Sequence, residues 1–587
     1  MDTAFERDDW VATPAAQALL RNNRPLLAYI AGKAAAFTSK DHTFLPGETV
    51  EKQIIIINNS RETVTCDNQW SLALPKVLTG SKQVTIATGQ QERIPLRFDL
   101  PATLAPGRYE LAATSKFSNG ESQQDAFSID VIQRPAAAAL DAKVAIFDPK
   151  GETTELLGKL GFRGQPVDAH RDLSGFDVLF IGKAAPTLDG AVPDIARVRD
   201  GLKVVIFEQT AEVLEKRFGF RVAEYGLRQV FQRVPDHFLL AGITPEHLLD
   251  WRGEATTLAP RLKYQLRPRY GPTVQWCDIP VTRLWRCGNR GNVASVLIEK
   301  PTRGDFLPIL DGGFSLQYSP LIEYREGKGM ILFCQMDVTG RSESEPVAEL
   351  LVQNLLQYVL TWEPTPQRKV VYVGDAAGKA HLQSAGIPVD SYDGGKLSPD
   401  QILVVSNNGS ERVRGRTQVI ADWLRLGGNL LAIGLDATEA NELLPFKVTM
   451  KRTEHISAFF DTPADSLLAG IGPADVHNRD PREFPLIAAG ATIVGDGALA
   501  HAEDADVVFC QMPPWQFDGT KQLNLKRTQR RAAFVVSRVL GNMGAASVTP
   551  LLDRFHQPVK ADEKRWLEGF YLDQPEEWDN PYRFFRW

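Results

Sequence analysis

Apolar and polar positions alternate with a period of two between residues 36 and 132. The runs 94–100, 109–113 and 127–131 each place an apolar side chain at every second position. Short runs of this kind, separated by glycine, proline and asparagine, are typical of antiparallel strands. We therefore predict an immunoglobulin-like β-sandwich over residues 38–133. Its predicted interior includes Trp70, Leu96, Phe98, Tyr109 and Ile129.

The pattern changes after residue 141. Apolar strands at 143–147, 178–181 and 202–207 alternate with segments of helical spacing. The final strand, 330–334, precedes a helix that opens near Pro346. Strands that alternate with helices predict a parallel sheet covered on both faces. The proline-containing stretch QRPAAAALD (133–141) is the predicted linker.

The same series of segments then recurs in the same order. KVAIF at 143 corresponds to KVVYV at 369, and FDVLFIG at 176 corresponds to DQILVVS at 400. DGLKVVIFEQ at 200 corresponds to LGGNLLAIGL at 426. Two short motifs recur unchanged: LLAGI at 239 and 467, and FCQM at 333 and 509. We predict two tandem α/β domains with parallel sheets, at 142–362 and 368–545. The first copy has roughly fifty additional residues between LLAGI and FCQM, placed at about 262–311 and predicted to lie on the surface.

Cysteines and tryptophans make the insertion the most distinctive part of the first copy. It holds Trp276, Cys277, Trp285 and Cys287. The two cysteines are near enough in sequence to form a disulfide, although two unpaired thiols remain the simpler interpretation. The chain has five cysteines and no CxxC pair, so neither a zinc site nor a redox motif is predicted.

Charge and hydropathy narrow the classes of partner. A net charge of −6 over 587 residues gives no basic face for a phosphate backbone, so we expect no nucleic-acid partner. No apolar run approaches the roughly 20 residues that a membrane helix needs. The first ten residues, MDTAFERDDW, are acidic and polar and do not resemble a signal peptide.

Polar residues after the predicted strands are the first candidates for a site, because ligands of open parallel sheets bind beyond the carboxyl ends of the strands. Solvated loop ends and helix caps are the competing interpretation. The residues at these positions are Asp148, Glu208 and Asp337 in the first copy and Asp375, Asn407 and Asp436 in the second.

Two further sets of residues could carry chemistry. Cys334 and Cys510 lie within apolar strands, where a thiol is a small buried side chain rather than a nucleophile. His247, with Asp250, Trp251 and Arg252, could line a polar pocket after the first LLAGI, or these residues could simply belong to a loop. The sequence contains no HExxH, GxGxxG, P-loop or GxSxG motif, so no cofactor and no metal ion is predicted.

Both ends of the chain resemble a known family. RNNRPLLAYIAG followed by FTSKDHTFLPGETVEKQIIIINNSRETV, and the C-terminal WLEGFYLDQPEEWDNPYRFFRW, resemble large bacterial β-galactosidase-like proteins of glycoside hydrolase family 2. The resemblance implies that residues 1–37 are the end of a catalytic barrel or a linker. It also implies a bacterial, exported or periplasmic setting. The α/β copies are similar to the flavodoxin-like trimerisation domain of β-galactosidases and, more distantly, to class I glutamine amidotransferases, so the resemblance implies two tandem flavodoxin-like, amidotransferase-like domains.

The resemblance assigns no catalytic residue to this chain. The family's acid/base and nucleophile glutamates would lie before Met1, and the amidotransferase cysteine would fall at Glu208 and, in the second copy, Leu435. The sequence therefore predicts a non-catalytic scaffold or oligomerisation portion of a glycoside hydrolase. Its partners would be further copies of the chain or a catalytic barrel. A carbohydrate-binding protein and a hydrolase with a site at the strand ends of one copy are the alternatives.

The C-terminal tail, 546–587, is unusually aromatic. Residues 562–587 alone contain eight aromatic side chains. Exposing so much apolar area to water is costly, at roughly 25 cal/mol per Å². We therefore expect the tail to pack on this chain or on a partner.

Overall fold

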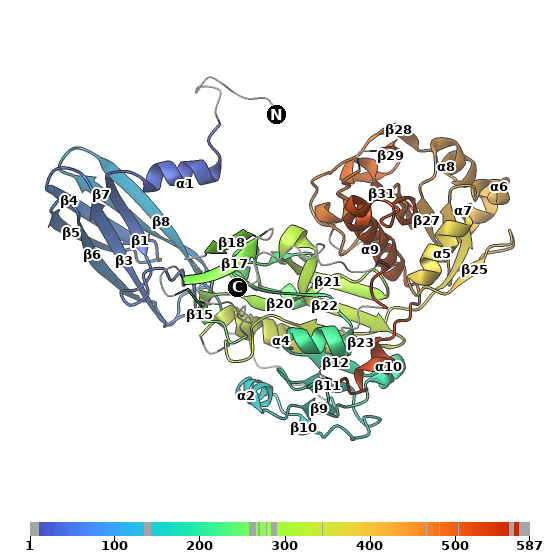
Figure 1. The fold of residues 1–587 in the computed structure, drawn as a ribbon, viewed down its shortest axis with the longest axis horizontal. Helices are drawn as coiled ribbons and strands as arrows, with labels where there is room; N and C mark the ends of the chain where they lie inside the picture. Colours follow the sequence, from blue (N-terminus) through green and yellow to red (C-terminus); the bar gives the residue numbers. More distant parts are fainter. Residues whose placement is uncertain are drawn as a thin grey trace. The chain divides into compact units, whose positions relative to one another are not determined.

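A computed structural model describes residues 11–133, 142–257, 266–267, 271–276, 279–282, 290–342, 344–463, 467–480, 482–502, 504–560, 562 and 569–573. These residues form two compact units (Figure 1). The first unit contains the described residues up to 133, together with 250–254 and 344–350. The second unit contains the rest.

Two sheets pack face to face in the first unit. One has the order β1 (Leu26–Ala31), β3 (Thr49–Asn58), β6 (Gln90–Asp99). The other has the order β2 (Thr43–Phe44), β8 (Ser122–Val131), β7 (Gly107–Phe117), β4 (Val64–Leu72), β5 (Leu78–Ile86). Of the five predicted interior residues, Leu96, Phe98 and Ile129 are buried, while Trp70 and Tyr109 are half-buried against the same core. The alternation therefore identified the inward face correctly.

Side chains of β8 cap the free edge of β1, which follows helix α1 (Pro14–Asn22). The Gln123 amide accepts a hydrogen bond from the Ala28 amide nitrogen at 2.8 Å and donates one to the Leu26 carbonyl at 2.8 Å. The Asp125 carboxylate accepts from the Ile30 amide nitrogen at 2.8 Å. An edge whose backbone groups are already bonded does not recruit another strand.

The first α/β sheet has five parallel strands in the order β10 (Gln165–Pro166), β9 (Val144–Phe147), β11 (Val178–Ile181), β12 (Lys203–Ile206), β23 (Gly329–Cys334). It continues through the antiparallel strands β22 (Tyr318–Glu326), β20 (Ala294–Glu299) and β13 (Val222–Leu227), and β21 (Asp305–Gly312) joins β22 to β14 (Phe231–Gln232). The associated helices are α2 (Glu152–Lys159), α3 (Ala211–Val213) and α4 (Pro346–Thr361).

The second α/β sheet repeats this order. Its parallel strands are β25 (Val389–Ser391), β24 (Lys369–Val373), β26 (Gln401–Ser406), β27 (Asn429–Ile433) and β32 (Val507–Cys510). The antiparallel β31 (Leu499–His501) and β30 (Thr492–Val494) follow, and β28 (Thr449–Glu454) pairs separately with β29 (Glu483–Ala489). The helices are α5 (Ala376–Ser384), α6 (Ser410–Val413), α7 (Thr417–Arg425), α8 (Ala437–Leu443) and α9 (Lys526–Asn542). The last helix, α10 (Leu551–Phe555), packs instead in the core of the first α/β sheet.

Strand register makes the two copies equivalent residue by residue. Phe333 pairs with Ile206 in the first sheet, and Phe509 pairs with Ala432 in the second, as the sequence repeat requires. Cys334 and Cys510 are both buried at equivalent strand positions, as predicted. Each pairs with a neighbouring antiparallel strand.

A helix asparagine explains why LLAGI is repeated. The Asn354 amide of α4 donates hydrogen bonds to the carbonyls of Leu239 and Ala241, at 3.2 and 2.8 Å. The Asn542 amide of α9 donates to the carbonyls of Leu467 and Ala469, both at 2.9 Å. In each copy the asparagine thus holds the LLAGI turn against the last helix.

The predicted surface insertion at 262–311 is partly wrong. Strands β20 and β21 fall within it or overlap its end, and both are buried members of the first sheet. The short strands β16 (Leu266–Arg267), β17 (Gly271–Trp276) and β18 (Ile279–Thr282) form a separate antiparallel sheet. The structure does not describe the Trp276 side chain, Cys277, Trp285 or Cys287. Whether Cys277 and Cys287 form a disulfide is therefore not tested.

Part of the aromatic tail is packed. Phe570 and Tyr571 are buried in the core of the first α/β sheet, and the Tyr571 hydroxyl donates to the Glu299 carbonyl at 2.8 Å. This confirms the expected packing for residues 569–573; the other tail aromatics lie outside the described residues. Across the described helices, none is both long and apolar enough to cross a membrane.

Candidate functional site

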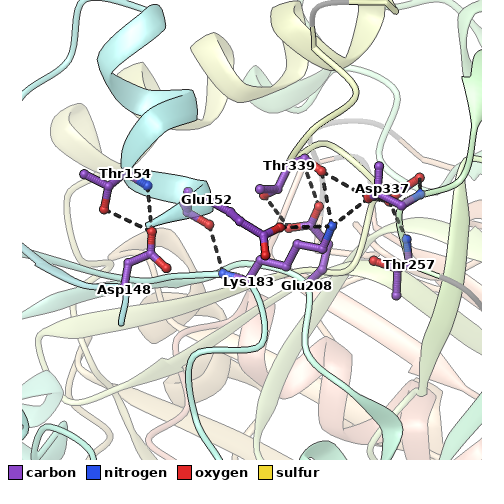
Figure 2. Close-up of polar contacts among 10 residues, drawn as sticks. Asp148, Glu152, Thr154, Lys183, Glu208, Thr257, Asp337 and Thr339 are labelled. Carbon is purple, nitrogen blue, oxygen red and sulfur yellow. Dashed lines mark hydrogen bonds and ion pairs between the residues drawn. The ribbon is translucent and has the colours of Figure 1, made fainter. Parts of the chain in front are cut away.

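Four charged residues follow four neighbouring parallel strands of the first α/β sheet. Asp148 follows β9, Lys183 follows β11, Glu208 follows β12, and Asp337 lies beyond β23. Because parallel strands end at one edge of a sheet, these residues and their loops gather there (Figure 2). We call this group the strand-end cluster.

Glu208, like Asp337, is almost fully buried in the strand-end cluster, with 1% of its surface exposed. Its carboxylate accepts hydrogen bonds from the Thr339 amide nitrogen at 2.7 Å and from the Thr339 hydroxyl at 2.9 Å. Burial raises the pKa of Glu208 to about 7, with Lys183 opposing the rise and Asp337 adding to it. Glu208 can therefore exchange a proton near neutral pH, although both of its oxygens are held by one loop residue.

Asp337 connects three chain segments. Its Oδ2 accepts from the Thr256 amide nitrogen at 2.9 Å and from the Arg341 guanidinium at 2.7 Å. Its Oδ1 accepts from the Thr257 amide nitrogen at 3.1 Å and from the Thr256 hydroxyl. A carboxylate that already accepts four hydrogen bonds has little capacity left for a ligand.

Lys183 lies at the outer side of the strand-end cluster. Its ammonium donates to the Thr256 hydroxyl at 2.7 Å and to the Thr339 carbonyl at 3.3 Å. It also lies 3.8 Å from the carboxylate of Glu152, whose side chain is half exposed (Figure 2). Lys183 therefore ties the 256 and 339 loops to the start of α2.

Asp148 shapes the first loop of the sheet. Its Oδ2 accepts from both the amide and the hydroxyl of Thr154, at 2.7 and 3.0 Å, which fixes the first turn of α2. A Cβ added at Gly182 would lie 2.4 Å from the other carboxylate oxygen, so glycine is required for this close approach. The role is that of a helix cap, as the competing interpretation predicted.

The second copy has replaced the charges of this edge. By the repeat, Asn407, Gly434, Pro513 and Trp515 occupy the positions of Lys183, Glu208, Asp337 and Thr339. The register also corrects one prediction: the second-copy counterpart of Glu208 is Gly434, not Leu435, because Ala432 pairs with Phe509 as Ile206 pairs with Phe333.

The remaining acidic candidates of the second copy are helix caps. Asp375 accepts from the Gly378 amide nitrogen at 2.6 Å at the start of α5. Asp436 accepts from the Glu439 amide nitrogen at 2.9 Å and forms a capping box at the start of α8. Both satisfy free backbone donors of a first helical turn.

The structure does not gather His247, Asp250, Trp251 and Arg252 into one described pocket. His247 belongs to the α/β unit, where its Nδ1 accepts from the Thr244 amide nitrogen at 3.1 Å in a capping box. The other three belong to the sandwich unit. There the Arg252 amide nitrogen donates to Glu345 at 2.8 Å, and its guanidinium contacts Glu48 at 3.2 Å and covers the Phe44 ring at 5.0 Å. Trp251, in β15 (Trp251–Glu254), is 1% exposed.

The repeated thiols are chemically protected. Burial raises the pKa of Cys510 to about 11 and moves the pKa of Cys334 further in the same direction. We expect iodoacetamide at pH 8 to leave Cys334 and Cys510 unlabelled in the folded chain and to label both in denaturant. Peptide mapping by mass spectrometry reads both sites, and rapid native labelling of either would contradict their burial.

The described part of the chain has no cluster of metal-binding side chains. No group of three or more His, Cys, Asp or Glu side chains there is arranged to hold a metal ion. The strand-end cluster offers a buried carboxyl, a bonded carboxylate and an ammonium, a set that suits proton exchange and loop fixation.

Sequence reasoning found Glu208 and Asp337 but missed their partners. Lys183, Thr256, Thr339 and Arg341 complete the strand-end cluster. The signal for Lys183 was present in the repeat, since FDVLFIGK aligns with DQILVVSN and differs in charge at its last position. Thr256 could not be found this way, because it reaches Asp337 from a loop 81 residues away.

Comparisons with known proteins identify no family. No protein family and no curated protein matches the chain. The solved structures similar to parts of it include the CARDB domain of a Pyrococcus furiosus protein (13% identity, TM-score 0.15, covering 18% of this chain and 87% of that one). They also include a family 123 glycoside hydrolase from Clostridium perfringens (12%, 0.14, 22% and 32%) and a Listeria innocua β-glucosidase (13%, 0.14, 18% and 16%). These likenesses cover small shares of the chain, and at such TM-scores they carry no argument.

Proposed function

We propose that this chain is a non-catalytic scaffold and assembly portion of a glycoside hydrolase of the β-galactosidase-like type. It would present an immunoglobulin-like sandwich and two flavodoxin-like, amidotransferase-related domains beside a catalytic barrel. The strand order of both sheets supports the flavodoxin-like assignment, since it is the 2-1-3-4-5 order of that doubly wound fold.

One observation carries this proposal: the carboxylates of the strand-end cluster already accept hydrogen bonds from other groups of the chain. Asp337 accepts four, and Glu208 accepts two from a single residue. A catalytic carboxylate must instead face the reacting atoms. The second copy, with Gly434 and Pro513 at these positions, has neither carboxylate.

A hydrolase that uses the strand ends of the first copy is the second candidate. The pKa of about 7 at Glu208 favours it, because general acids and bases work best when their pKa lies near the working pH.

Turnover assays separate the two candidates. We expect the purified chain to release no product from aryl glycosides or from glutamine. Turnover that survives repeated purification and is lost in both Glu208→Gln and Asp337→Asn would overturn the scaffold proposal in favour of the hydrolase. Turnover unchanged by both variants would identify a contaminating enzyme.

Light scattering tests the assembly role. The chain has a mass of 65.0 kDa, and we expect a multiple of this mass at micromolar concentration. A monomer under these conditions would contradict self-association as the scaffold's role.

A further inference from the structure

A cavity of about 750 Å³ opens at the amino ends of β9 and β10 in the first α/β copy. We call it the rim groove, and it lies at the opposite ends of the strands from the strand-end cluster. Its lining includes Ala142, Lys143, Arg163, Arg171, Gly175 and Phe176.

In the second copy a segment of the chain itself lies beside the equivalent place. The Arg368 amide nitrogen donates to the Gly544 carbonyl at 2.8 Å, and the Val548 amide nitrogen donates to the Gly386 carbonyl at 2.9 Å. Arg368 also forms a parallel bridge with Ala545. The extended segment 544–548, of sequence GAASV, therefore lies along the start of β24.

Side-chain size explains why the first copy has a cavity here. Arg368 extends across the rim of the second copy and donates to the carbonyls of Pro399 and Gly427, at 3.2 and 2.7 Å. The first copy has smaller residues at three of the equivalent positions, which the register and the repeat define. They are Ala142 for Arg368, Gly164 for Val389 and Gly175 for Pro399.

Three cationic side chains line the rim groove, those of Lys143, Arg163 and Arg171. In the second copy Pro388 and Gly395 take the places of the two arginines, but Arg368 and Lys396 take those of Ala142 and Asp172, so positive charge is common to both copies. The carboxylate among the lining residues, Asp172, is engaged by the Ser174 amide and hydroxyl at 2.9 and 2.6 Å. The groove therefore has an excess of positive charge.

We propose that the rim groove is the docking site for an extended, acidic peptide segment of a partner protein. The peptide would lie along the start of β9 as segment 544–548 lies along β24, with small side chains over Ala142 and Gly175. Its carboxylates would pair with Arg163 and Arg171, because guanidinium groups bind carboxylates in a bidentate geometry. This inference does not depend on whether the chain is catalytic.

Fluorescence anisotropy with a labelled peptide of sequence EEGAASVEE tests the proposal on the full chain. We expect micromolar binding that Arg163→Glu and Arg171→Glu each weaken by at least about tenfold. Both arginines are exposed, so the substitutions should leave the fold intact. Arg425→Glu, the same change on an exposed arginine of α7, should leave binding unchanged.

Ala142→Arg separates shape from charge. This substitution would introduce an arginine equivalent to Arg368, which extends across the rim of the second copy. It should therefore abolish binding even though it adds a positive charge. Three outcomes would overturn the proposal: no binding by the unmodified chain, equal weakening by Arg425→Glu, or binding that Ala142→Arg leaves intact. Equally tight binding of the uncharged peptide QQGAASVQQ would overturn the acidic specificity.

Discussion

Asp475→Asn is expected to destabilise the α/β unit by about 3–5 kcal/mol, because it breaks a buried ring of charges between the two copies. Asp475 Oδ2 lies 3.2 Å from the Arg233 guanidinium, and its Oδ1 lies 3.7 Å from the Lys300 ammonium. Lys300 also lies 2.9 Å from Asp311, which contacts Arg233 and closes the ring. All four side chains are at least 95% buried.

Charge balance explains the size of this effect. The first copy supplies two cations, Arg233 and Lys300, but only one carboxylate, Asp311, to the ring. Asp475 of the second copy supplies the other carboxylate. Burial already lowers the pKa of Lys300 well below its usual range, and Asp475 opposes that shift. Without Asp475 the unit must either bury an unpaired positive charge or release the proton of Lys300, and both destabilise the folded state.

Urea unfolding followed by fluorescence measures the loss, and two variants test its cause. Lys300→Met in the Asp475→Asn background restores charge balance and should recover at least half of the lost stability. Asp422→Asn, which breaks an exposed pair with Arg425, should cost less than about 1 kcal/mol. If Asp475→Asn were no more destabilising than Asp422→Asn, the ring would contribute little.

The repeat allowed the sequence to predict much of the fold. Because FCQM and LLAGI recur in order, the two parallel sheets and the buried Cys334 and Cys510 could be placed in advance. The predicted insertion was wrongly assigned to the surface in part, because a largely apolar run such as 305–312 has the same sequence pattern in a surface hairpin as in an extension of the sheet. Only the pairing of β21 with β22 decides between them.

The ring and the strand-end cluster were harder to foresee. Asp475 and His247 occupy the same position of a repeated turn, and each closes a capping box. Local sequence predicts only that shared capping role. The additional role of Asp475 depends on Arg233, more than two hundred residues away, and becomes visible only when the copies are packed together.

Glu208→Gln is expected to stabilise the chain above pH 7 and to have little effect near pH 4.5. Burial raises the pKa of Glu208 from 4.5 to about 7, so the folded state binds a proton between these values that the unfolded state has released. Stability from this group is therefore present at low pH and is lost as the pH rises through 7. The full difference amounts to about 3 kcal/mol. Glutamine is uncharged and can still accept from the Thr339 amide nitrogen, so it avoids the cost of ionisation.

Thermal unfolding at pH 5 and pH 8 measures this effect. The midpoint of Glu208→Gln should exceed that of the unmodified chain at pH 8, and the difference should shrink markedly at pH 5. Glu212→Gln, on an exposed side chain of neighbouring α3, should show no comparable pH dependence. A Glu208→Gln difference of the same size at both pH values would mean that Glu208 ionises in the folded chain as it does in water. In that case its hydrogen bonds from Thr339 and its proximity to Lys183 would fully offset its burial, and Glu208 would lose the property that makes it a candidate acid or base.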